Sequence, residues 1–189
     1  MHVTHSSVPL QYLSLVLAWL LAGLWPVLVA NAQAAPSDLE TTRSAQTVRY
    51  VERLLGEINL RREQAGVPTL TLAPESANVA ADRYLADLTP PMLGAGICNH
   101  GAGSPARYGW DYVAETGFAG AGRGEVIACP DTTGYWTPAR LAQSWWDSPV
   151  HQRILYADPR ASLVACGTYG LQRDGAAYQT VACVTYAES

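Results

Sequence analysis

The chain has 189 residues, of which 49% are hydrophobic and 15% are charged, and its formal net charge is -4. This mildly acidic balance argues against nucleic acid or an anionic membrane surface as the main partner. About 155 residues remain after a predicted leader, which is enough for one domain with a sizeable core and not enough for two.

The first 34 residues have the pattern of a secretory signal peptide. An apolar run covers residues 12–30, and two Ala-x-Ala patterns typical of a cleavage site follow it. Because the run is nearly long enough to span a bilayer, an uncleaved N-terminal anchor is the alternative. Both interpretations place the rest of the chain outside the cytoplasm, either secreted or anchored by the leader. We expect residues 35–45 to form a polar linker and residues 46–187 to form the domain.

Two helices are expected in the first half of this domain. Between residues 46 and 65, apolar side chains recur at helical spacing, on Val48, Val51, Leu54, Leu55 and Ile58. A second helix is expected to begin at Pro74 and to run to about Leu88, because the Pro90-Pro91 pair after it removes two backbone donors.

The middle of the chain is rich in glycine. We expect an irregular segment over residues 92–103, a short helix over residues 104–108 and a loop over residues 112–124. A short apolar strand is expected over residues 124–129, with Glu125 at its entry.

Two consecutive helices are expected to hold a histidine in place. Thr137 and Pro138 open the first helix as N-cap and first-turn proline, and its apolar face carries Trp145. Ser148 is the expected N-cap of the second helix, because the proline after it favours an extended conformation at that serine. His151 then lies in the first turn of the second helix.

The last strands are expected to form a hairpin that decides the cysteine pairing. Two apolar segments flank Asp174-Gly175, a strong two-residue turn signal. In that register Cys166 faces Cys183 at a non-hydrogen-bonded pair, where the Cα atoms lie about 4.5 Å apart, unless a bulge shifts the strands. An exported context favours disulfides over a metal cluster. If Cys166 pairs with Cys183, Cys98 must pair with Cys129.

Both faces of this hairpin are apolar, so both must be covered. With the helices that precede it, the pattern predicts an α+β protein in which helices sandwich a small antiparallel sheet. The motifs that follow one another along the chain are LLGEINLR at residues 54–61, LTLAPE at 70–75, CNH at 98–100, GEVIA at 124–128 and WWDSPVH at 145–151.

In order and spacing these motifs resemble the CAP superfamily, or SCP domain, which includes cysteine-rich secretory proteins, antigen 5 and plant pathogenesis-related proteins. The similarity is greatest to the bacterial secreted form with a Trp-x-x-Ser-Pro-x-His motif, and it covers residues 46–186. The resemblance implies an α-β-α sandwich with a cleft that holds two histidines and acidic residues. Some members bind a divalent metal such as zinc there.

Transferred by position, the resemblance assigns the cleft to His100, Glu125 and His151. The chain departs from the family pattern at Ser148, where animal and plant members have a second glutamate, and at Val126, where asparagine is usual. A histidine common in the second helix is replaced near Arg83-Tyr84, so the resemblance supports the fold more strongly than it supports metal binding.

The chemistry of these residues supports the same assignment. His100 and His151 are the only histidines outside the leader, and two imidazoles with a carboxylate are the minimum set for an open zinc site. The alternatives are structural histidines and a Glu125 that accepts backbone N–H bonds at a strand edge.

Four neighbours of His151 are candidate cleft residues. Asp147 could orient its imidazole, and Ser148 could be a nucleophile, although N-cap duty explains that serine more simply. Trp145 and Trp146 are expected in the core and the cleft wall.

Three functions are compatible with the sequence. The favoured one is a secreted, non-enzymatic binding module whose cleft takes a metal and a small or lipid-like ligand. The second is a metal-assisted hydrolase of ester, peptide or cell-wall glycan bonds, although no recognisable acid-base pair or nucleophile motif is present. The third is a protein that interacts with a cell-envelope component and has a vestigial cleft.

Overall fold

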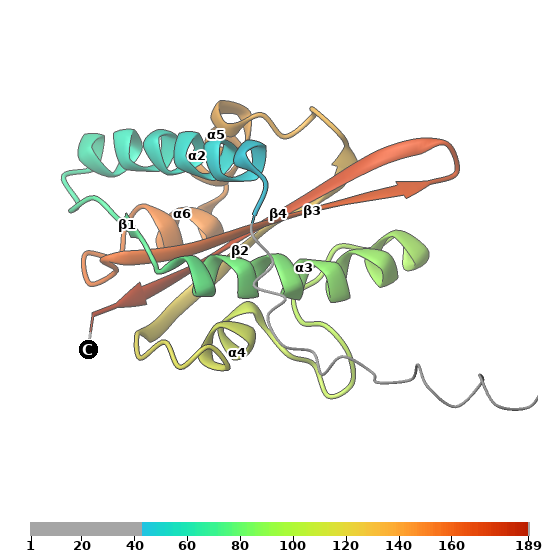
Figure 1. Ribbon diagram of the computed structural model, residues 1–189. Coiled ribbons are helices and arrows are strands. Elements are labelled where there is room, and N and C mark those ends of the chain that lie inside the picture. Colours follow the sequence, from blue (N-terminus) through green and yellow to red (C-terminus); the bar gives the residue numbers. More distant parts are fainter. Residues whose placement is uncertain (1–42, 189) are drawn as a thin grey trace, which may run out of the picture. The chain divides into compact units, whose positions relative to one another are not determined.

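The structure is a computed structural model that describes residues 43–188, so the predicted leader and most of the predicted linker lie outside the described residues. The elements are α2 (Ala45–Gln64), β1 (Thr71–Leu72), α3 (Glu75–Ala95), α4 (Gly109–Ala114), β2 (Ala121–Thr132), α5 (Pro138–Asp147), α6 (Pro149–Leu155), β3 (Leu163–Arg173) and β4 (Ala176–Ala187). Figure 1 shows their arrangement.

The four strands form one sheet in the order β1-β3-β4-β2. Strand β4 pairs antiparallel with both β3 and β2, and the two-residue β1 adds a short parallel contact to β3. The predicted hairpin register is confirmed, because Arg173 pairs with Ala176 and Cys166 pairs with Cys183. Asp174 and Gly175 at the turn both have positive φ, as a two-residue hairpin turn of this kind requires.

Helices cover both faces of the sheet, as the two-faced hairpin predicted. Helices α2, α5 and α6 lie on one face, and α3 and α4 lie on the other (Figure 1). Strand residues alternate between the two cores: Val164, Cys166, Val181 and Cys183 pack toward α2 and α5, whereas Ala165, Ala182, Val184 and Tyr186 pack toward α3 and α4. The predicted α-β-α sandwich is therefore confirmed, with a mixed sheet at its centre.

The buried stripe of α2 lies slightly C-terminal to the predicted one. It consists of Val51, Leu54, Ile58 and Arg62, whereas Leu55 is only partly buried. The spacing is helical throughout, so the last position of the stripe falls on a charged residue. This buried arginine was not predicted.

Helix α3 does not end before Pro90-Pro91, which corrects the sequence prediction. It continues to Ala95 and is closed by Gly96 in the left-handed conformation, whose N–H bonds to the Met92 carbonyl. Both prolines lie on the exposed side of the helix, where the carbonyls that they leave without a donor can reach water. Burial of Leu88, Thr89 and Met92 keeps the last turns against the sheet.

The predicted helix at residues 104–108 was also wrong. That segment is a turn closed by backbone pairing of Ala102 with Arg107, and the helix, α4, begins at Gly109. The Asp111 carboxylate accepts a hydrogen bond from the Tyr108 N–H at 2.7 Å and so fixes the start of α4. Strand β2 begins at Ala121, inside the segment expected to be a loop, because it pairs along β4.

The described chain enters the fold earlier than the predicted linker boundary. Arg43 is 8% exposed, and its guanidinium bonds the Asp82 carboxylate at 2.8 Å and the Cys166 carbonyl at 2.9 Å. The Ser44 hydroxyl accepts a bond from the Thr47 N–H and caps α2. Within residues 43–188, none of the helices combines the length and the apolar character that crossing a lipid bilayer requires.

Candidate functional site

The loop that carries His100 is tied to the strand that carries Glu125. The predicted Cys98–Cys129 disulfide is present, with its Cα atoms 5.4 Å apart. It joins a residue two positions before His100 to a residue four positions after Glu125. The second predicted disulfide, Cys166–Cys183, crosses the hairpin with a Cα separation of 4.1 Å. The Cys98–Cys129 bridge therefore limits the freedom of the glycine-rich segment that carries His100.

Glu125 is a buried carboxylate at the centre of the site, with a side chain only 1% exposed. It lies within β2 rather than at its entry, on the face toward α3 and α4. Its Oε1 accepts hydrogen bonds from the Tyr84 hydroxyl at 2.8 Å and from His100 Nδ1 at 2.7 Å, with the imidazole proton on Nδ1. Its Oε2 accepts a bond from the Gly109 N–H. Both carboxylate oxygens are thus engaged by donors of the protein.

Tyr84 connects the buried carboxylate to the histidine loop. Its hydroxyl donates to Glu125 and accepts a bond from the Gly101 N–H at 3.1 Å. Burial, and then the neighbouring carboxylate, raise the pKa of Tyr84, so the hydroxyl stays protonated and remains a donor. In the sequence, Tyr84 stood out only as the place where a family histidine is replaced, and this role was not predicted.

Gly109 is a position that the site requires to have no side chain. A Cβ atom added there would lie 2.7 Å from Glu125 Oε2 and 2.7 Å from Val184 Cγ2. Such distances are far inside van der Waals contact, so only glycine lets the start of α4 approach the carboxylate. No pattern in the sequence indicated this constraint.

His151 lies on α6, which packs on the other face of the sheet from α3 and α4. This helix packs directly on β2, since a Cβ atom at Gly124 would lie 2.7 Å from Ile154 Cγ2. The half-buried imidazole lies near Trp145, with ring centroids 6.5 Å apart. Burial, and then the neighbouring His100, lower the pKa of His151. Among the described residues, Glu125 is hydrogen-bonded to His100, and no hydrogen bond joins it to His151.

The other four candidate cleft residues have different surroundings. Trp145 is a core residue, 1% exposed, and Trp146 packs edge-on against Tyr156. Ser148 precedes α6 in an extended conformation, but its side chain makes no capping bond. Asp147 is exposed and accepts a bond from the Gln143 carboxamide at 2.9 Å, one helical turn back. The Asp147 carboxylate therefore binds a residue of its own helix, α5, and not His151.

The donor set indicates which groups could hold a metal ion. Within residues 43–188, no group of three or more histidine, cysteine, aspartate or glutamate side chains has the arrangement of a metal site. Glu125 is engaged by three donors, and His100 uses Nδ1 to bind it. Nε2 of His100, whose side chain is 42% exposed, and the His151 imidazole remain as candidate ligands. A carboxylate that orients a ligating imidazole in this way is common beside metals.

The fold and the site together define a disulfide-bridged α-β-α domain with a carboxylate-oriented histidine at the edge of its sheet. Comparison of the sequence with models of known families found no match, and comparison with curated proteins found no significant one.

Comparison with solved structures found similar folds. An extracellular protein of Bacillus anthracis that contains an SCP domain superposes with a TM-score of 0.51 at 15% identity, over 76% of this chain and 41% of that one. A cysteine-rich secretory protein of Staphylococcus aureus gives 0.44 at 11%, over 77% and 40%. An outer surface protein of Borrelia burgdorferi gives 0.48 at 11%, over 74% and 94%.

The chain thus has the fold of the SCP domain, as the order of its motifs indicated, and the Bacillus structure carries this assignment. It spans about two fifths of the length of the Bacillus and Staphylococcus proteins. At these identities the similarity extends to the fold alone.

Proposed function

We propose that the protein is a secreted CAP-domain binding module whose histidine cleft holds a divalent metal ion, with His100 and His151 as its protein ligands. The observation that carries this proposal is the bond of 2.7 Å between His100 Nδ1 and a carboxylate that is itself 1% exposed. Three donors compensate the burial of this carboxylate and hold it rigidly, and a rigid carboxylate bonded to one ring nitrogen is the arrangement that orients ligating histidines.

The electrostatics of His151 support the same proposal. Its lowered pKa favours the neutral imidazole at neutral pH, and the neutral form is the one that ligates a metal. A bound zinc ion would supply a Lewis-acid centre with positions open to water or a small ligand. The role proposed for Glu125 is to fix the ring of His100, in place of the direct ligation suggested by the sequence.

Secretion is the second part of the proposal. The leader pattern of the first 34 residues supports it, as do the two disulfides of the described domain, because such bonds persist in oxidising compartments. Fractionation of cells that produce the full chain tests it, and recovery of the domain from the cytosol would contradict it.

Calorimetric zinc titration tests the metal site. Wild type should bind zinc, and His100→Ala/His151→Ala should lose the binding while its far-UV circular dichroism is unchanged. Glu125→Gln should weaken zinc binding by about 10–100-fold, because it disturbs the orientation of His100 without removing a ligand. The matched control is Asp147→Asn, an exposed carboxylate of α5 that should leave the affinity unchanged. Equal zinc affinity in wild type and the double variant would refute the proposal.

A further inference from the structure

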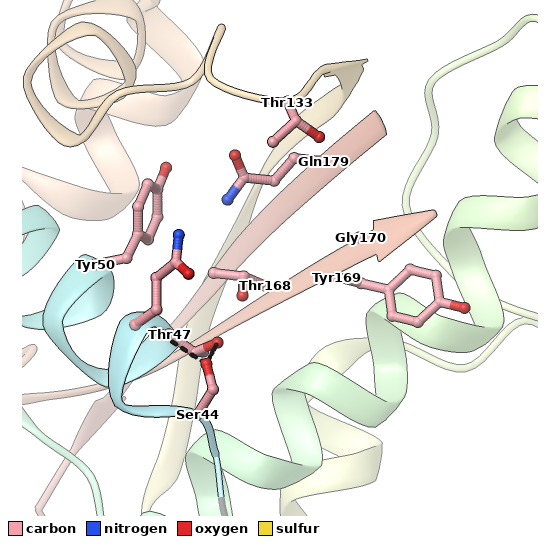
Figure 2. Close-up of a pocket in the computed structure, with 9 residues that line it drawn as sticks. Ser44, Thr47, Tyr50, Thr133, Thr168, Tyr169, Gly170 and Gln179 are labelled. Atoms are coloured by element: carbon pink, nitrogen blue, oxygen red, sulfur yellow. Dashed lines mark hydrogen bonds between the residues drawn. The ribbon is translucent and has the colours of Figure 1, made fainter. Parts of the chain in front are cut away.

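A second concavity lies on the other side of the sheet from Glu125. It is a pocket of about 210 Å³ between the first turns of α2, the outer part of the β3–β4 hairpin and the segment after β2 (Figure 2). Gln179 of β4 lines it, on the strand face that packs toward α2. Val184, the β4 partner of Glu125, packs toward α3 and α4. The pocket is therefore distinct from the histidine cleft.

The chemistry of the lining is polar and uncharged. Within residues 43–188, no charged side chain lines the pocket. The lining residues contribute hydroxyl and carboxamide groups, on Ser44, Gln46, Thr47, Thr133, Thr168 and Gln179. Ser44 and Thr47 bond each other at 2.9 Å (Figure 2). The hydrogen bonds among the described residues do not use the two carboxamides, so these can offer donors and acceptors to a ligand.

Tyr50 adds an aromatic wall whose polar end is already engaged. Its hydroxyl donates to the Trp136 carbonyl at 2.7 Å, and burial raises the pKa of Tyr50, so the group stays neutral. With the hydroxyl held, the ring contributes its apolar surface. Figure 2 shows Tyr50 and Gln179 flanking the pocket, whereas the ring of Tyr169 points away toward α3.

We propose that this pocket binds a single neutral sugar unit. A pyranose ring has an apolar C–H face that packs on an aromatic ring and hydroxyls that both donate and accept, which matches Tyr50 beside two carboxamides. The volume of about 210 Å³ is below the range of about 300–1,000 Å³ usual for drug-sized ligands, so one ring fits better than a longer chain. A charged ligand would lose hydration without finding a counter-ion in the lining.

Calorimetry with the full chain and methyl glycosides tests this proposal. Methyl β-D-glucoside or methyl N-acetyl-β-D-glucosaminide should bind with millimolar affinity, as expected for a small ligand with few atoms. The charged counterparts, glucuronic acid and glucosamine, should bind at least tenfold more weakly. Absence of binding by both neutral glycosides, or equal binding of the charged ones, would overturn the proposal.

Gly170 allows the pocket to be filled without disturbing the fold. It lies on β3, lines the pocket and has no positive φ, and an added Cβ atom would meet only the Tyr178 carbonyl oxygen, at 3.8 Å. Gly170→Val should therefore fold normally, since valine suits a strand, and should lose sugar binding. Gln179→Ala should weaken binding at least tenfold.

Two control variants test whether the sugar binds in this pocket and not elsewhere on the domain. Gln172→Ala changes an exposed glutamine of the same hairpin outside the pocket and should leave binding unchanged. His100→Ala/His151→Ala should also leave it unchanged, and a loss there would transfer the sugar to the histidine cleft and overturn the proposal. Binding that survives in folded Gly170→Val would overturn it as well.

Discussion

Replacing Arg62 by methionine tests how the fold holds the helix that carries His151. The guanidinium is buried at 0% exposure and donates to four backbone carbonyls. These belong to Pro68 at 2.6 Å, to Leu155, to Asp158 at 3.1 Å and to Ala161 at 3.0 Å. Leu155 is the last residue of α6, so one side chain of α2 fixes the end of α6 and the connection to β3.

The expected loss of stability follows from what remains after the substitution. The carbonyls of Pro68 and Asp158 lie at partly buried positions and can turn to water, whereas those of Leu155 and Ala161 are buried and would each lose a donor. An orphaned buried acceptor costs about 1–3 kcal/mol. Methionine also removes the buried charge and leaves no unpaired charge behind, so the two orphaned carbonyls set the loss of stability. Two such acceptors lead us to expect that Arg62→Met lowers the free energy of unfolding by about 2–6 kcal/mol.

Urea unfolding followed by tryptophan fluorescence measures this change. The matched control is Arg53→Met, an exposed arginine of the same helix, which should change the free energy of unfolding by less than about 0.5 kcal/mol. A cost below about 1 kcal/mol for Arg62→Met, with an unchanged denaturant slope, would mean that the carbonyls find other donors and would refute the role assigned to Arg62.

Three further changes test the site. In the presence of chelator, the free energy of unfolding should fall as the pH drops below 6.5, because burial and His100 lower the pKa of folded His151 below that value and the unfolded chain then binds the extra proton. Unfolding curves at pH 5.5 and 7.5 measure this fall, which should be smaller in His151→Gln. An equal fall in the variant would contradict the assignment. Opening the Cys98–Cys129 loop, with a sequence separation of 31 residues, by Cys98→Ser/Cys129→Ser should cost about 3.5–4 kcal/mol, and an unchanged melting temperature would refute this. Gly109→Ala should lower the free energy of unfolding by about 1–3 kcal/mol, because the added methyl group overpacks the site. It should also displace Glu125 and so shift the NMR signals of the His100 imidazole. Unchanged signals would mean that Glu125 accommodates the methyl group.

The hairpin shows how much of the fold can be predicted from local signals. The Asp174-Gly175 turn set the register, the register brought Cys166 opposite Cys183, and the second disulfide then followed by elimination. Each step depends on residues close in sequence or on a period of two, which a strand cannot avoid.

Local rules failed where packing opposed them. A proline pair normally ends a helix, but α3 continues beyond Pro90-Pro91, because Met92 is buried and Gly96 closes the helix after it. Arg62 continues the buried spacing of Val51, Leu54 and Ile58, but a charged side chain at a core position has no local signal of the carbonyls that it will meet.

The sequence by itself determined the two apolar faces of the hairpin and both disulfides, because periodicity and turn chemistry depend on neighbouring residues. It also singled out His100 and His151 as candidates, because they are the only histidines outside the predicted leader. Only the tertiary structure decided that Glu125 binds Tyr84, His100 and Gly109, and therefore that its carboxylate orients an imidazole. Those partners come from α3, a loop and α4, and a hydrogen bond between such distant segments exists only after the helices have packed on the sheet.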